Sequence, residues 1–112
     1  MIRAFALSAA ALALGTPLPA AANDFPTEAR VDYVIGCMAA NGQTQEAMRR
    51  CSCSIDAVAS IMPFEAYERA DTVLRMRGVS GEAAGMFREV KALRDVVDQL
   101  RAAQVEADFR CF

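Results

Sequence analysis

The four cysteines of this 112-residue chain constrain its fold more than any other feature. They are Cys37, Cys51, Cys53 and Cys111, so that two of them are separated by a single residue. An even number of cysteines in a short secreted domain is typical of a disulfide framework. Four cysteines allow three pairings, and the choice among them depends on the secondary structure that carries them.

Residues 1–22 predict a secretory signal peptide. Arg3 provides a positive start, an apolar segment rich in Ala and Leu follows, and Ala20 and Ala22 are the small residues that precede a cleavage site. The apolar segment is too short and too rich in Ala for a retained membrane span. We therefore expect a single mature domain over residues 23–112, exported to the periplasm, where disulfides persist.

Apolar residues recur with helical spacing throughout residues 23–112, and no segment alternates as a strand would. The spacing predicts four helices, over residues 27–40, 44–62, 64–77 and 81–109. Thr44 and Ser80 are expected to cap the second and the fourth helix, and Pro63 to separate the second from the third. Because two to four residues join successive helices, neighbours should be antiparallel. The predicted fold class is all-α, a small four-helix domain whose last helix packs along the other three.

Each predicted helix has an apolar face that should form the core. The faces are Val31, Val34, Ile35 and Met38 in the first helix, Met48, Cys51, Ile55, Val58 and Met62 in the second, Phe64, Tyr67 and Leu74 in the third, and Met86, Val90, Leu93, Val97 and Leu100 in the fourth. Asp71 interrupts the third face, and an ion pair with Arg75, one helical turn later, is the expected reason. Tyr33 and Phe109 lie off these faces and are candidates for exposed aromatic contacts.

Helix geometry favours one pairing of the cysteines. Cys51 and Cys53 point about 200° apart on one helix, so they cannot bond to each other without local unfolding. Cys37 and Cys51 lie at similar heights above the turn that joins their helices, with Cys53 one step farther away. We therefore predict Cys37–Cys51 and Cys53–Cys111 rather than Cys37–Cys53 and Cys51–Cys111. In the loop-entropy model these bonds contribute about 3 and about 4 kcal/mol.

The alternative is that Cys51-Ser52-Cys53 is a redox or metal-binding pair. Arg49 and Arg50 precede it, and basic neighbours lower the pKa of a thiol. A copper site would need soft ligands, and the methionines at 38, 48, 62, 76 and 86 are available. These methionines are widely separated and fall on apolar faces or near helix ends, which is typical of core packing. Structural disulfides are therefore the favoured interpretation.

The absence of His excludes several kinds of active site. It removes the commonest general base, imidazole metal ligands, nucleophile pairs with His and the Cys-x-x-Cys-His attachment of c-type haem. The net charge of −2, without a basic stripe that alternates with aromatic residues, argues against nucleic acid as a partner. Asp95 with Asp98, and Glu106 with Asp108, lack the spacing of a calcium loop and should form a solvated face. We predict no catalytic, cofactor or metal site.

Three segments carry a resemblance to a group of known proteins. They are Tyr33-Val-Ile-Gly-Cys37-Met-Ala-Ala-Asn41-Gly42, Arg50-Cys51-Ser-Cys53-Ser-Ile-Asp56 and Arg110-Cys111-Phe112. Together they resemble uncharacterised small secreted four-Cys helical proteins of Gram-negative bacteria, some of which accompany pyrroloquinoline-quinone-dependent alcohol dehydrogenases and their cytochromes. The resemblance implies an accessory role in periplasmic alcohol oxidation, with a quinoprotein dehydrogenase or its cytochrome as the partner, and assigns no site residue. A metal- or thiol-handling factor that uses Cys51 and Cys53 is the alternative function.

We predict that the exported protein lacks residues 1–22, because small residues at positions 20 and 22 follow an apolar segment that prolines interrupt. The intact mass of protein recovered from the periplasm measures this directly. A mass that still includes Met1 to Ala22 would show that the segment is not a cleaved signal peptide.

Overall fold

A computed structural model describes residues 15, 24–78 and 82–112, and in these ranges all regular secondary structure is α-helical. The helices are α1 (Thr27–Asn41), α2 (Gln45–Ile61), α3 (Phe64–Arg77), α4 (Glu82–Glu89) and α5 (Lys91–Cys111). The predicted all-α class is confirmed. The predicted signal peptide, apart from Gly15, and the predicted cap Ser80 lie outside the described residues. None of the helices within these ranges combines the length and the apolar composition needed to span a bilayer.

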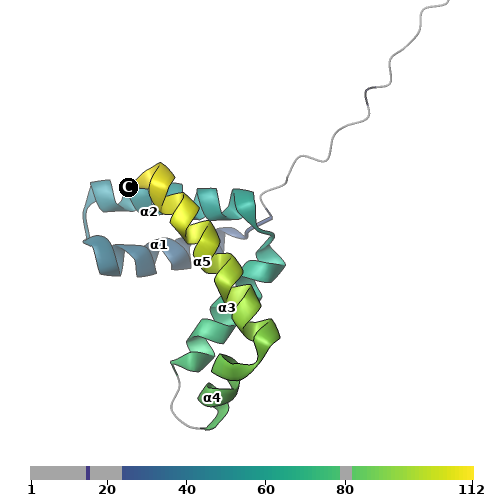
Figure 1. Ribbon diagram of the computed structural model, residues 1–112. Helices are drawn as coiled ribbons and strands as arrows, with labels where there is room; N and C mark the ends of the chain where they lie inside the picture. Colours follow the sequence, from purple (N-terminus) through teal and green to yellow (C-terminus); the bar gives the residue numbers. More distant parts are fainter. Residues whose placement is uncertain (1–14, 16–23, 79–81) are drawn as a thin grey trace, which may run out of the picture.

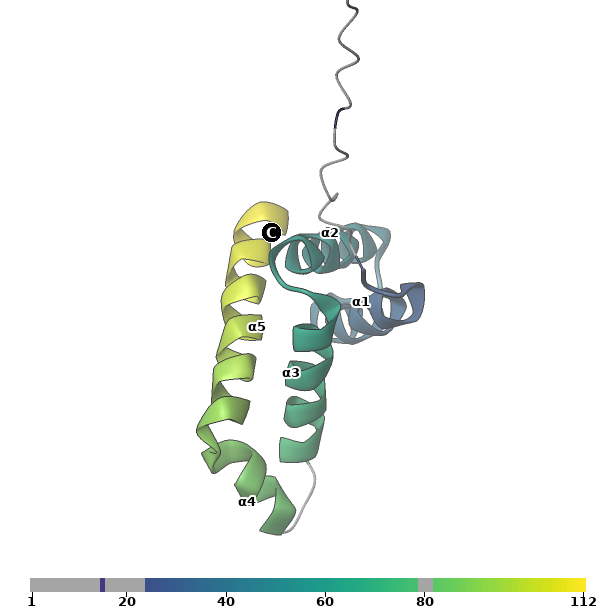
Figure 2. The ribbon, with the colours of Figure 1, turned by 90° about the vertical axis from the view of Figure 1, so that its right-hand side faces the viewer.

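The helices form two antiparallel hairpins that cross each other (Figures 1 and 2). One hairpin is α1 with α2, and the other is α3 with α5, while α4 lies at the far end of the second hairpin (Figure 2). α1 packs mainly on α2, and α5 lies along α3 and across α2. The expected antiparallel pairing therefore holds within each hairpin but not between α2 and α3, which cross, and the expectation that the last helix packs along all three others is wrong. The chain turns sharply between α2 and α3, where Met62 and Pro63 are both extended.

Hydrogen bonds and a glycine account for three of the helix ends, namely the start of α2, the start of α3 and the end of α1. The Thr44 hydroxyl accepts a hydrogen bond from the Ala47 amide at 3.0 Å and caps α2, as predicted. The Asp24 carboxylate accepts from the Phe64 amide at 3.1 Å, and so caps α3 from a position 40 residues earlier in the chain. Gly42, with φ of 107°, follows the end of α1, and a side chain there would be strained.

The core lies where the two hairpins cross. Its largest fully buried side chains are Cys51, Ser54, Ile55, Val58 and Val97. α2 and α5 supply all of them, whereas no residue of α1 is fully buried. Packing around α2 therefore dominates the hydrophobic stabilisation of the domain.

The prediction for the buried face of α1 is wrong in part. Val31 and Ile35 are 51% and 63% exposed, while Tyr33, predicted as an exposed aromatic, is half-buried. The Tyr33 hydroxyl lies 2.8 Å from the Ser54 hydroxyl, and Cys37 on the same side of α1 is bonded to Cys51. These two contacts with α2 fix the rotation of α1, and they turn Val31 and Ile35 toward solvent.

The predicted fourth helix is in fact two helices, which meet at Val90. This residue is extended, with φ of −71° and ψ of 121°, and its β-branched side chain favours such a conformation. An unbroken helix over residues 82–111 would be about 45 Å long, far longer than α3 at about 21 Å. The break lets α4 fold against the end of α3, where the Arg77 guanidinium donates to the Phe87 carbonyl at 2.9 Å. Met86 and Val90, predicted in the core, are consequently exposed.

The predicted pairing of the cysteines is confirmed. Cys37–Cys51 joins α1 to α2 across 14 residues, and Cys53–Cys111 joins α2 to the last turn of α5 across 58 residues. The two bonds leave opposite sides of α2, as the spacing of Cys51 and Cys53 requires. α2 is thus covalently attached to α1, its partner in the first hairpin, and to α5 of the second hairpin.

We predict that replacing Cys53 and Cys111 together with Ser loosens the end of α5 and leaves the α1–α2 hairpin closed. The free energy of unfolding should fall by a few kcal/mol, with about 4 kcal/mol as the loop-entropy value. Chemical denaturation measures the loss, and hydrogen exchange locates it. Unchanged exchange at residues 105–111 would contradict the predicted role of this bond.

Candidate functional site

An ion-pair bridge between α1 and α3 separates two grooves on the surface. Arg75 of α3 contacts Asp32 of α1 at 2.6 Å and Asp71 of its own helix at 2.8 Å. The pair of Asp71 with Arg75 confirms the prediction from helical spacing. Arg75 also pairs with Asp32, 43 residues earlier in the chain, and no local sequence pattern predicts this contact. All three residues line both grooves, so the bridge forms their common wall.

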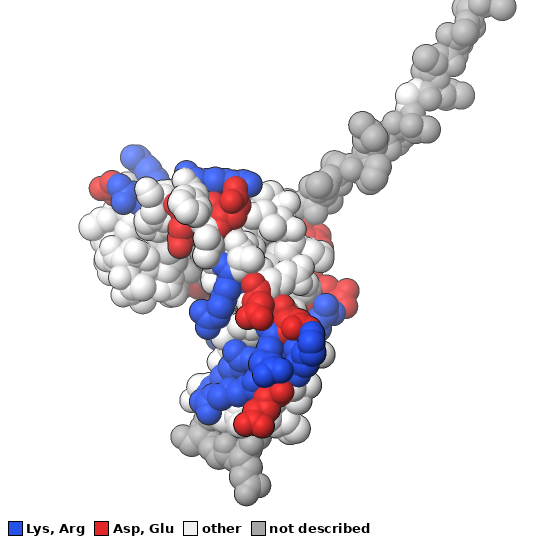
Figure 3. Space-filling view, viewed as in Figure 1, with Lys and Arg blue, Asp and Glu red and all other residues white. Residues whose placement is uncertain are grey.

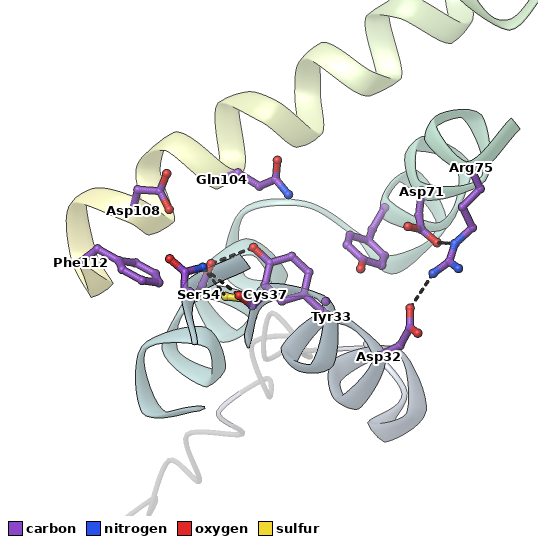
Figure 4. A pocket seen from close by; sticks show the side chains of 12 residues that line it. Asp32, Tyr33, Cys37, Ser54, Asp71, Arg75, Gln104, Asp108 and Phe112 are labelled. Carbon is purple, nitrogen blue, oxygen red and sulfur yellow. Dashed lines mark hydrogen bonds and ion pairs between the residues drawn. The ribbon is translucent and has the colours of Figure 1, made fainter. Parts of the chain in front are cut away.

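The first of these, the polar groove, has a volume of about 680 Å³ and lies between α1, α3 and the end of α5 (Figure 4). On one side Tyr33 and Ser54 share a hydrogen bond, and the Tyr67 ring lies 6.5 Å from that of Tyr33. On the other side Figure 4 shows Gln104 and Asp108, both from α5. The polar groove therefore offers hydroxyl, amide and carboxylate groups to a polar ligand.

Tyr67 is held in its neutral form in the polar groove. Burial, and secondarily the negative charge of Asp71, raise the pKa of its phenol to about 12. The hydroxyl of Tyr33 shares its hydrogen bond with Ser54 rather than with a carboxylate. Activation of a hydroxyl as a nucleophile requires a base within hydrogen-bond distance, and the described residues of this groove show no such pair.

The second groove, which we call the α1–α3 valley, has a volume of about 770 Å³ and a different chemistry. Val31 and Ile35 of α1 and Phe64 of α3 provide an apolar floor. Acidic side chains from both helices surround it, namely Glu28, Asp32, Glu68 and Asp71, and the cation among its lining residues is Arg75. The valley is thus an apolar strip with a negative rim.

Helical spacing identified the apolar residues of the valley but not their place at the surface. Helical spacing placed Val31 and Ile35 on the same face as Val34 and Met38, and this face was interpreted as core. Phe64 was likewise assigned to a core face, and it is half-buried beside Phe25, with ring centroids 5.2 Å apart. An apolar stripe on a helix predicts burial, but a stripe alone does not distinguish burial in the core from burial by a partner.

The cysteines form no thiol or metal site as they stand. Cys51 and Cys53 are in separate disulfides, so neither sulfur is available as a ligand, and the alternative function requires both bonds to be reduced. Within residues 24–78 and 82–112, no cluster of three or more Cys, Asp or Glu side chains could hold a metal ion. The methionines considered as soft ligands are dispersed, with Met62 buried just after α2 and Met86 exposed on α4.

The remaining expectations concern exposed residues. Phe109 is 85% exposed on α5, which confirms the prediction of an exposed aromatic. Asp95, Asp98, Glu106 and Asp108 are all exposed and form the predicted solvated face. Arg49 and Arg50 are exposed on α2, and Arg50 lies over the Phe112 ring at 5.8 Å.

Comparison of the chain with protein-family models, with curated proteins and with solved structures finds no match.

We predict that Tyr67 makes stability depend on alkaline pH. Its pKa is about 12 in the folded protein and 10.0 for an exposed phenol, so the unfolded chain binds fewer protons between these values. The free energy of unfolding should therefore fall as the pH rises through this range, by about 1 kcal/mol between about pH 9 and about pH 11. Urea unfolding of the wild type and of Tyr67→Phe measures the difference. An equal loss in both proteins would contradict the assignment to Tyr67.

Proposed function

We propose that this protein is a non-enzymatic accessory protein of the periplasm that acts by binding another protein. The observation that carries the proposal is the α1–α3 valley, in which Val31 and Ile35 are exposed beside Phe64. Apolar side chains that a fold holds together at its surface, inside a polar rim, are typical of a protein-binding site.

The apolar floor provides the affinity. Full burial of a Val or Ile side chain contributes about 1.5–3 kcal/mol, and about half of that gain remains for a partner at side chains that are half exposed. The Cys37–Cys51 bond and the contact between Tyr33 and Ser54 hold α1 in place, so binding need not order the valley first. A preorganised surface loses less entropy when a complex forms.

The acidic rim indicates the chemistry of the partner. Four carboxylates stand against one guanidinium, which already contacts Asp32 and Asp71. A segment with apolar side chains between Lys or Arg residues would complement this pattern, as amphipathic helices do in apolar grooves. The partner segment is therefore apolar and basic.

The compartment and the partner's identity are further parts of the proposal. Two disulfides in a chain with a predicted signal peptide support an oxidising compartment, and the resemblance to secreted four-Cys proteins supports the periplasm. The same resemblance suggests the partner, a quinoprotein alcohol dehydrogenase or its cytochrome. Binding at the valley would then link this protein to periplasmic alcohol oxidation.

We expect Val31→Asp/Ile35→Asp to weaken binding of the quinoprotein dehydrogenase or its cytochrome by about tenfold or more, because 1.4 kcal/mol corresponds to a factor of ten. Both added charges lie in an apolar strip that is already surrounded by carboxylates. The measurement is the dissociation constant between purified proteins.

The matched control is Val105→Asp/Phe109→Asp, which places two charges at the same spacing on exposed apolar residues of α5. Equal weakening by both variants would exclude the valley as the contact surface. Failure of the wild type to bind either protein would contradict the partner assignment. Circular dichroism shows whether each variant retains its helices.

A further inference from the structure

A second charged surface, the cationic groove, lies where α3, α4 and α5 meet. It has a volume of about 460 Å³, and its lining includes five cationic side chains and two carboxylates. The cations are Arg77 of α3, Arg88 of α4, and Lys91, Arg94 and Arg101 of α5, and the carboxylates are Asp95 and Asp98. Figure 3 shows Lys and Arg side chains gathered over α4 and the adjacent part of α5. The excess of positive charge contrasts with the net charge of −2 of the whole chain.

None of the four arginines of this groove has a carboxylate partner among the described residues. Elsewhere in the described chain, five arginines form ion pairs with Asp or Glu, namely Arg30, Arg50, Arg69, Arg75 and Arg110. Among the described residues, five arginines form no ion pair with a carboxylate. Four of them belong to the groove, namely Arg77, Arg88, Arg94 and Arg101, and the fifth is Arg49. The guanidinium groups of the groove are therefore available to an anion from outside the chain.

Two of these arginines are held in position by the main chain. The Arg77 guanidinium donates to the Phe87 carbonyl, and the Arg88 guanidinium donates to the Arg77 carbonyl, each at 2.9 Å. Both bonds span the junction between α3 and α4. They satisfy part of the donor capacity of each guanidinium and leave the charge unneutralised. The fold thus fixes two positive charges at the edge of the groove.

The start of α5 adds to the positive potential. Its first turn contains Lys91 and Arg94 and no acidic residue, and Val90 provides no side-chain cap. Basic residues are unfavourable at this end of a helix, because the helix dipole is positive there. An anion bound nearby would compensate both the dipole and the cations. This arrangement is costly for the isolated domain and suits a surface that binds an anion.

Exposed apolar side chains accompany the cations. Met86 is 60% exposed on α4, and Val90, at the break between α4 and α5, is 42% exposed. Val90 lies one helical turn from both Met86 and Arg94, because its amide donates to the Met86 carbonyl at 3.3 Å and its carbonyl accepts from the Arg94 amide at 3.1 Å. α4 lies at the end of the molecule in both ribbon views (Figures 1 and 2), so a flat surface can reach it. Apolar side chains among Lys and Arg are the pattern of proteins that bind at a lipid–water interface.

We propose that the cationic groove, with Met86 and Val90, docks the protein on an anionic phospholipid membrane, with lipid phosphate groups in the groove. Arg guanidinium groups match the geometry of phosphate oxygens, and an apolar side chain beside them enters the headgroup region. α1 and α5 lie on opposite sides of α3 (Figure 2), so the α1–α3 valley stays open while the groove faces a membrane. This role is independent of the partner proposed for the valley.

Vesicle co-sedimentation tests the proposal with protein recovered from the periplasm. The probes are vesicles of phosphatidylcholine alone and vesicles that also contain phosphatidylglycerol. We expect binding to the second kind, weakened by high salt, and a loss of about thirtyfold in Arg94→Gln/Arg101→Gln, since each cation contributes about 1 kcal/mol near an anionic surface. The matched control, Arg49→Gln/Arg110→Gln, removes the same charge from other surfaces and should bind like the wild type.

A second variant separates a membrane from a soluble phosphate compound. Met86→Ser/Val90→Ser keeps every cation, and Ser at position 90 is compatible with the start of α5. It should weaken vesicle binding and leave the binding of soluble polyphosphate unchanged. Equal binding to both kinds of vesicle, or equal losses in the Arg94/Arg101 and Arg49/Arg110 variants, would overturn the proposal. Vesicle binding that Met86→Ser/Val90→Ser does not alter would overturn the membrane assignment in favour of soluble phosphates.

Discussion

The attachment of α2 to both sides of the fold is the constraint on which the other features depend. Cys51 and Cys53 are two positions apart, so a helix directs them to opposite sides, and each bonds to a different helix. Cys51 holds α1, and Cys53 holds the end of α5. A domain of this size buries a limited core, and covalent links of this kind supply stability that the core alone would lack. The rotation of α1, the position of the valley and the crossing of the hairpins all follow from α2.

The bonds also explain how the protein keeps apolar residues at its surface. Val31 and Ile35 belong to the apolar stripe of α1, yet they are 51% and 63% exposed. The bond of Cys37 to Cys51, together with the hydrogen bond of Tyr33 to Ser54, turns the other side of α1 toward α2. The free-energy cost of exposing two apolar side chains is offset by the stability that the Cys37–Cys51 bond contributes. The surface gains a site that a partner can cover.

Local chemistry predicted the parts of the fold that local interactions determine. The bounds of α1, α2 and α3 agree with the prediction within one or two residues, because Thr44, Pro63 and the turn after Asn41 are signals within the sequence itself. The pairing of the cysteines was also predictable, since helix geometry at Cys51 and Cys53 excludes a direct bond. The break at Val90 was missed because one β-branched residue is a weak local signal, and the short length of α3, which a continuous last helix would exceed, is not part of the local pattern. Helical spacing alone favoured one long helix.

The candidate sites were less predictable, because long-range contacts create them. Asp32 meets Arg75 across 43 residues, and Val31 meets Phe64 at a groove formed by two helices. Val34 belongs to the apolar stripe of α1 that includes Val31 and Ile35, and it also packs against the core beside Tyr33. The sequence pattern therefore allowed α1 to turn either side toward α2. The arginines of the cationic groove come from three helices and form no run in the sequence. Tertiary structure was needed to bring these residues together.

The order of the cysteines along the chain has a consequence for biogenesis. A chain that emerges from its N-terminus presents Cys37, Cys51 and Cys53 well before Cys111, which is 58 residues beyond Cys53. The hairpin of α1 and α2 can close at that stage, and it directs Cys53 away from the bond just formed. Until α5 arrives, the growing protein therefore carries one accessible thiol, and the disappearance of that thiol marks the completed fold. Any oxidase that acts on the chain must wait for its last helix, so a truncated product remains chemically distinguishable from the finished one.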